Sequence, residues 1–215
     1  MRITSTLVLA CVFSAFSVAH ARAQTVAQVS SFKGTQASTF VVFGPSVICA
    51  DGSVGTANGF GFISGSDSIT HSPGSPKSIS NGGFIEIFDY SDSCTGTFIG
   101  FGIAGLSGGY TAPHANLASA ALSGTTTLQD LDTGASYPFS LNLVFTANAP
   151  LQTSRGTTVT HDYPGYALVV SHGASSSRDA GVTGTITING LEPEASYSST
   201  VINSNTSGQT TVTKK

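Results

Sequence analysis

Two cysteines, Cys49 and Cys94, constrain the fold of this chain most, because they are the only ones that follow a predicted secretory signal. Residues 1–23 combine an early positive charge, an apolar stretch and an Ala-x-Ala cleavage site, which is typical of a signal peptide. Cysteines of exported proteins usually pair, because the compartment is oxidising. We therefore predict a Cys49–Cys94 disulfide and a secreted, periplasmic or cell-surface location.

The N-terminal segment leaves one alternative open. Cys11 lies within the apolar stretch, so lipid attachment at this residue competes with simple cleavage near residue 24. No later segment approaches the roughly 20 consecutive apolar residues that a membrane-spanning helix needs. We expect no transmembrane segment in the mature chain.

Charge is sparse in this sequence. Asp, Glu, Lys and Arg make up 9% of the chain, against about a quarter in a typical soluble protein. Without residues 1–23, six basic side chains stand against eleven acidic ones, a net charge of −5. A nucleic-acid partner is not expected, since phosphate binding needs clustered cations. The histidines show no metal-binding spacing, and no cofactor motif is present.

The pattern of apolar residues predicts an all-β domain. Apolar and polar residues alternate in segments such as 84–90 and 137–145, and Asp51-Gly52 and Asn189-Gly190 are typical hairpin turns. About ten short strands are expected between residues 24 and 215, as one antiparallel β-sandwich of the jelly-roll or immunoglobulin type. A β-solenoid and a small barrel, including one of the outer-membrane kind, are the alternatives.

Particular segments carry more specific expectations. Residues 64–83, rich in Ser, Gly and Pro, read as a long surface loop. In residues 84–90, alternation places Phe84, Glu86, Phe88 and Tyr90 on one face. The large apolar residues of 137–145 should form a main wall of the core, built mostly by the second half of the chain. The disulfide would then staple the N-terminal half to that core.

Two patterns suggest chemistry. The sequence Gly105-Leu106-Ser107-Gly108-Gly109 matches the nucleophile motif of serine hydrolases, but that motif needs a strand, a sharp turn and a helix. The helix pattern is missing here, and a glycine-rich turn is the simpler interpretation. Gly-Phe-Gly recurs at 59–61 and 100–102, without the fixed period of a repeat protein.

The distribution of arginine is the more informative pattern. The two arginines after residue 23 share one segment with histidine, aspartate and tyrosine, which suggests a small polar binding site for sugar hydroxyls or a carboxylate. Its candidate residues are Arg155, His161, Asp162, Tyr163, His172, Arg178 and Asp179. A structural Arg–Asp pair is the competing interpretation.

The function expected from these observations is non-catalytic. We predict an exported β-domain with a structural or binding role, whose partner is a carbohydrate or another surface protein. The alternative is a secreted hydrolase with a loop-borne site near His161, Asp162, His172, Arg178 and Asp179. No catalytic residue, metal ligand or cofactor is assigned.

Overall fold

The chain forms ten antiparallel strands in the computed structural model, which describes residues 25–112, 116–162 and 167–214. Within these ranges there is no helix, and so none that could cross a membrane. The predicted all-β class is confirmed. The strands are β1 (Thr25–Ile48), β2 (Val54–His71), β3 (Ser78–Asp92), β4 (Phe98–Ser107), β5 (Tyr110–Thr111), β6 (Ser119–Asp130), β7 (Ser136–Ala147), β8 (Gln152–Asp162), β9 (Ala167–Ile188) and β10 (Pro193–Lys214).

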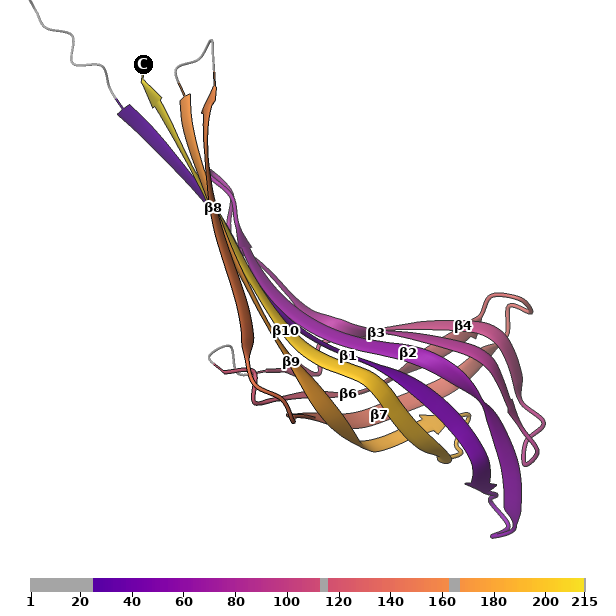
Figure 1. The fold of residues 1–215 in the computed structure, drawn as a ribbon. Helices are drawn as coiled ribbons and strands as arrows, with labels where there is room; N and C mark the ends of the chain where they lie inside the picture. The colour runs from indigo at the N-terminus through magenta and orange to yellow at the C-terminus, as the bar shows by residue number, and fades with distance from the viewer. Residues whose placement is uncertain (1–24, 113–115, 163–166, 215) are drawn as a thin grey trace, which may run out of the picture.

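The strands belong to one hydrogen-bonded sheet. Its order is β10-β1-β2-β3-β4-β6-β7-β9-β8, with β5 beside β6. The first half of β9 also pairs with β10, so β10, at one end of this order, is hydrogen-bonded to β9, the strand before the other end. Figure 1 shows a wide part, here called the body, from which a narrow twisted ribbon, here called the arm, extends.

The strands are longer than the sequence suggests. β1 has 24 residues, and β9 and β10 have 22 each, so the expectation of short strands is wrong. These strands run from the body into the arm without a break, through turn-like residues such as Lys33-Gly34 and 173–177. Neighbouring strands on both sides satisfy the backbone hydrogen bonds, and this pairing overrides local turn propensity.

The predicted surface loop at residues 64–83 is instead mostly strand. Residues 64–71 continue β2 and pair with β1 on one side and with β3 on the other. Only residues 72–77 form the connection between the two strands. The backbone of this Ser-rich segment is paired on both sides, and its serine side chains face solvent on the arm.

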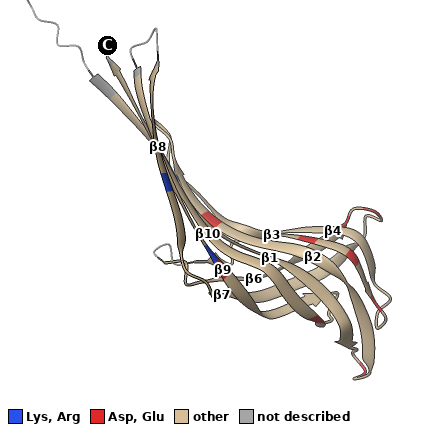
Figure 2. Cartoon of the chain, viewed as in Figure 1, with Lys and Arg blue, Asp and Glu red and all other residues tan. Residues whose placement is uncertain are grey.

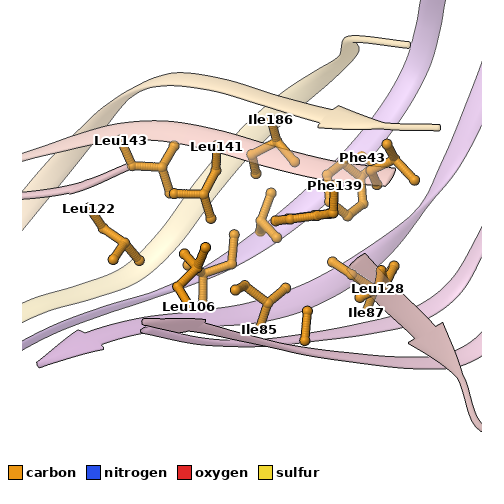
Figure 3. Close-up of a cluster of buried hydrophobic side chains, with 14 of the residues drawn as sticks. Phe43, Ile85, Ile87, Leu106, Leu122, Leu128, Phe139, Leu141, Leu143 and Ile186 are labelled. Atoms are coloured by element: carbon orange, nitrogen blue, oxygen red, sulfur yellow. The ribbon is translucent and has the colours of Figure 1, made fainter. Parts of the chain in front are cut away.

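The core of the body draws on both halves of the chain. Figure 3 shows Ile85, Ile87 and Leu106 of β3 and β4 facing Phe139, Leu141, Leu143 and Ile186 of β7 and β9. The predicted wall on β7 is confirmed, because Phe139, Leu141, Leu143 and Phe145 are all buried. The first half contributes as much, with Val41, Phe43, Ile63, Ile85, Ile87, Tyr90 and Ile99 also buried. The expectation of a core built mainly by the second half is therefore wrong.

Glycines on β2 and β3 let β6 approach closely. A Cβ atom built on Gly65 or Gly83 would lie 3.0 Å from a Leu122 methyl carbon. β6 does not pair with β2 or β3, so these contacts cross the core. Between the paired strands β4 and β6, a Cβ on Gly102 would lie 3.0 Å from Leu128 Cγ.

A bend crosses the sheet from β1 to β3. Gly44, Gly59 and Asp89 have φ angles of 112°, 144° and 47°, and the β2–β3 register shifts at Asn58/Phe60. Phe88 faces outward, whereas Tyr90 is buried. The expectation that Tyr90 shares a face with Phe88 is wrong, because the positive φ at Asp89 rotates the following side chain to the other face.

The Cys49–Cys94 disulfide is present, as predicted. It links the β1–β2 turn to the β3–β4 turn, and the two Cα atoms are 5.3 Å apart. A Cβ on Gly55 would lie 2.6 Å from the Cys94 sulfur, so the bridge packs directly against the β2 backbone.

The turn between β6 and β7 is organised by Asp130, which is fully buried. Its carboxylate accepts a 2.5 Å hydrogen bond from the Thr133 hydroxyl and weaker ones from the backbone N–H groups of Asp132 and Phe101, at 3.3 and 3.4 Å. The Thr133 bond, more than the backbone bonds, lowers the pKa of Asp130 below its ordinary value. The folded state therefore favours the ionised form of Asp130.

Substituting Asp130→Asn should make stability less dependent on pH. A carboxyl whose pKa is lower in the folded state stabilises above its unfolded pKa, near 4, and this contribution disappears as pH falls through the folded pKa. We expect the variant to be less stable by about 1.5–3 kcal/mol at pH 7, the range of a hydrogen bond to a charged group. Urea unfolding from pH 7 to pH 2.5 should show this gap closing below about pH 4. A gap that stays constant with pH would contradict this role of the carboxylate.

Candidate functional site

The residues of the predicted polar site lie along β8 and β9. Arg155 and His161 are on β8, where Asp162 is the last residue, and His172 and Arg178 are on β9, followed by Asp179. Tyr163 is outside the described residues. His172 and Arg178 are six positions apart on one strand, about 20 Å at about 3.3 Å per residue. The structure does not bring Arg178 and Asp179 to His172.

Arg178 makes contacts that hold loops to the sheet. Its Nε donates to the Ala149 carbonyl and its Nη1 to the Asn116 carbonyl, both at 3.0 Å. The backbone N–H of Asn148 donates to the Asp179 carbonyl at 3.0 Å. Arg178 thus anchors the segments before β6 and after β7, and these contacts give it a structural role.

The serine-hydrolase motif lies in a turn. Ser107 is the last residue of β4, and Gly108 and Gly109, with φ near 80°, lead to the two-residue strand β5. A Cβ on Gly109 would lie 1.9 Å from the Ser123 carbonyl oxygen, so close strand approach accounts for this glycine. The connection holds no helix, which a nucleophile elbow requires.

The buried tyrosines offer no acid–base chemistry near neutral pH. Burial, and secondarily the Asp92 carboxylate, raises the pKa of Tyr90. Burial likewise raises the pKa of Tyr110 to about 12. Both hydroxyls stay protonated in the folded protein at physiological pH.

A stack of four phenylalanines crosses the outer face of β1–β4. Phe60, Phe88 and Phe101 lie directly opposite one another on β2, β3 and β4, and Phe40 of β1 joins diagonally. The ring centroids are 5.8, 5.3 and 5.0 Å apart along this series, and the interplanar angles fall from 26° to 12°. We call these four residues the aromatic face.

The aromatic face is accessible to solvent. Phe60 is 38% exposed and its direct neighbour Val42 is 44% exposed, whereas Phe40, Phe88 and Phe101 are half-buried. Phe84, farther along β3 on the same side, is 44% exposed. The inward residues of the same strands, such as Ile85 and Ile87, already fill the core. These phenylalanines therefore make no contribution to the core, and a solvent-facing apolar patch of this kind marks an interaction site.

A hollow adjoins the aromatic face at the bend. It has a volume of about 560 Å³ and is lined by Phe40, Val42, Phe43, Asn58, Gly59, Phe60 and Asp89. Gly59 forms part of this surface because its backbone touches Tyr90: a Cβ would lie 2.7 Å from the Tyr90 Cα. The bend thus creates a concave edge beside the stacked rings.

The charge around the aromatic face is acidic. Glu86 lies on the same side of β3, between Phe62 and Ile103 of the neighbouring strands, and Asp89 lines the hollow. The parts of β1–β4 that build the body contain no Lys or Arg among the described residues. In the view of Figure 2 most acidic positions lie on the body, and the basic ones lie on strands that lead into the arm.

The sequence signal for this surface is the Gly-Phe-Gly pattern at 59–61 and 100–102. Sequence reasoning treated it as a weak repeat and missed the surface. In the structure each phenylalanine points outward while Gly61 and Gly102 occupy buried positions. When the glycines of such a strand face the core, the aromatic side chains on the other face are left to make contacts outside the core.

Comparison of the chain with family models, with curated proteins and with solved structures finds no match.

Proposed function

We propose that the chain is an exported, non-catalytic binding domain that recognises a protein partner through the aromatic face. We also infer that its body is a β-sandwich, with β1–β4 in one layer and β6, β7 and the end of β9 in the other. The single observation that carries the functional proposal is the stack of four phenylalanines on the outer face of the sheet, of which Phe60 is exposed and the other three are partly exposed. The export signal and the disulfide support a role outside the cytoplasm.

The geometry of the rings favours an apolar partner over a sugar at this surface. Sugars stack on the flat face of an aromatic ring, which must be open to solvent. Here the faces of Phe60 and Phe88 are occupied by their neighbours at 5.0–5.8 Å, and the rings present their edges. Ring edges and aliphatic groups such as Val42 form a ridged apolar surface that suits apolar side chains of a protein.

The flanking charges specify the partner further. Glu86 and Asp89 border the aromatic face, and no described Lys or Arg lies on this part of the sheet to neutralise them. A partner with an apolar centre and Lys or Arg at its rim would be complementary in both respects. We therefore expect the partner segment to be apolar and basic.

Selection experiments can test the class of ligand directly. A displayed library of random peptides would be selected on the immobilised mature domain, and a glycan array would be probed in parallel. We expect enriched peptides that combine aromatic or aliphatic residues with Lys or Arg, and no glycan whose binding depends on Phe60 or Phe88. Glycan binding that Phe60→Thr abolishes, or enriched peptides that bind equally well without the aromatic face, would refute the proposal.

A further inference from the structure

The arm has one face that collects basic side chains. Strand pairing places Arg155, Ala174, Thr206, Lys33 and Ile69 side by side across five strands, in a first cross-strand row. The adjacent row on the same face contains Thr157, His172, Gly208, Ser31 and His71. Directly opposed residues point to the same side of a sheet, and so do residues two apart. We call Lys33, His71, Arg155 and His172 the basic face.

The distribution of charge on the arm is one-sided. The two rows of the basic face contain no Asp or Glu. On the opposite side of the arm, the rows that alternate with them hold Ser, Thr, Gly, Asn, Gln and Phe32, and no charged side chain. The next row on the same face holds Asp67, opposite Thr35, whose backbone N–H donates to the Asp67 carboxylate. Lys33 and Arg155 thus outnumber the single carboxylate in these three rows.

The basic face has room for a ligand between its side chains. A hollow of about 400 Å³ is lined by both His71 and His172, with Ser31 and Gly208 between them. The His172 ring lies over Gly208, because a Cβ at this glycine would be 2.4 Å from His172 Nε2. The Nδ1 atom of His71 is buried and has no hydrogen-bond partner in the protein. The centre of the basic face thus combines small residues with a histidine whose Nδ1 has no partner within the protein.

The spacing of the basic groups indicates a polymer. Lys33 and Arg155 are three strands apart, about 14 Å at about 4.8 Å per strand, so one small anion would not reach both. The accompanying Ser31, Thr157 and Thr206 can hydrogen-bond to sugar hydroxyls. We propose that the basic face binds an acidic polysaccharide, with its anionic groups on Lys33 and Arg155 and its hydroxyls on the residues between. This site is independent of the aromatic face.

The proposal can be tested with dextran sulfate, neutral dextran and a single-stranded oligothymidylate of matched charge, each titrated against the mature domain. We expect dextran sulfate to bind and neutral dextran not to bind. The double variant Lys33→Gln/Arg155→Gln should bind dextran sulfate at least tenfold more weakly, because charge-assisted contacts are lost. Lys77→Gln, in the exposed connection between β2 and β3, is the matched control and should change affinity less than twofold.

Three outcomes would overturn this assignment. If neutral dextran bound as well as dextran sulfate, binding would not depend on charge. If Lys77→Gln weakened binding as much per removed charge as the double variant does, the effect would come from net charge and not from a site. Tighter binding of the oligothymidylate would identify the ligand as a nucleic acid instead. His172→Gln gives an independent check, since a ligand in the hollow should bind this variant more weakly, and unchanged affinity would exclude the hollow from the site.

Discussion

Replacing Cys49 and Cys94 by alanine is expected to lower the free energy of unfolding by about 4 kcal/mol, in one cooperative transition. The magnitude follows from the loop that the bridge closes: 45 positions separate the two cysteines, for which the chain-entropy model gives about 4 kcal/mol. The cooperativity follows from the core, in which Ile63, Ile85 and Ile87 of the first half pack with residues of the second. Neither half has a separate core that could persist alone.

Urea unfolding of the oxidised protein and of the double alanine variant measures both the difference in the free energy of unfolding and the number of transitions. The sequence by itself suggests that the N-terminal half should loosen first on reduction, because the disulfide lies entirely within it. The shared core predicts the opposite, a single transition that fluorescence and circular dichroism report at the same urea concentration. Two separate transitions would contradict the structural account. So would a decrease in the free energy of unfolding of less than about 1 kcal/mol, since the chain-entropy model gives about 4 kcal/mol.

The substitution Gly59→Ala is expected to cost at least about 3 kcal/mol, because it combines an unfavourable backbone conformation with a steric clash. Gly59 has a φ of 144°, a conformation that residues with a Cβ rarely adopt. The added Cβ would also lie 2.7 Å from the Tyr90 Cα. Both strands would have to move apart at the bend, and the hollow beside Phe60 would change shape.

Gly105→Ala is the matched control for Gly59→Ala. Gly105 lies on β4 in the same sheet, its φ is not positive, and a Cβ there would meet nothing within 4 Å. We expect this variant to be as stable as the parent or slightly more so, since alanine restricts the unfolded chain. Thermal and urea unfolding of the two variants should differ clearly, and equal stabilities would show that the bend at Gly59 is not required.

The regular parts of this fold follow from the sequence by simple rules. Alternation in residues 137–145 predicts a buried face that the structure confirms, and the two cysteines that follow the predicted signal peptide are paired as expected. Local turn signals were less informative. Residues 173–177 are turn-like in isolation, yet they lie within β9, because pairing with β8 on one side and β10 on the other supplies their hydrogen bonds.

The binding surfaces depend on register, which local sequence does not contain. Phe60 and Phe101 are 41 positions apart, and only the order β2-β3-β4 places them on either side of Phe88. Lys33 and Arg155 share a row only because β1, β10, β9 and β8 are adjacent. A single residue can also reverse a face, as Asp89 does for Tyr90. The sequence therefore predicted that these segments are strands, whereas the binding surfaces could be located only from the pairing of the strands.

The affinity of a library-selected peptide for matched variants tests the central claim most directly. The double variant Phe60→Thr/Phe88→Thr removes the middle of the aromatic face while keeping strand-compatible side chains. Val144→Ser/Val159→Ser removes two other exposed apolar side chains, 42% and 54% accessible, elsewhere on the molecule. By isothermal titration, the account predicts at least tenfold weaker binding for the first variant and less than twofold change for the second, with both folded by circular dichroism. Equal affinity for the parent and the phenylalanine variant would contradict it.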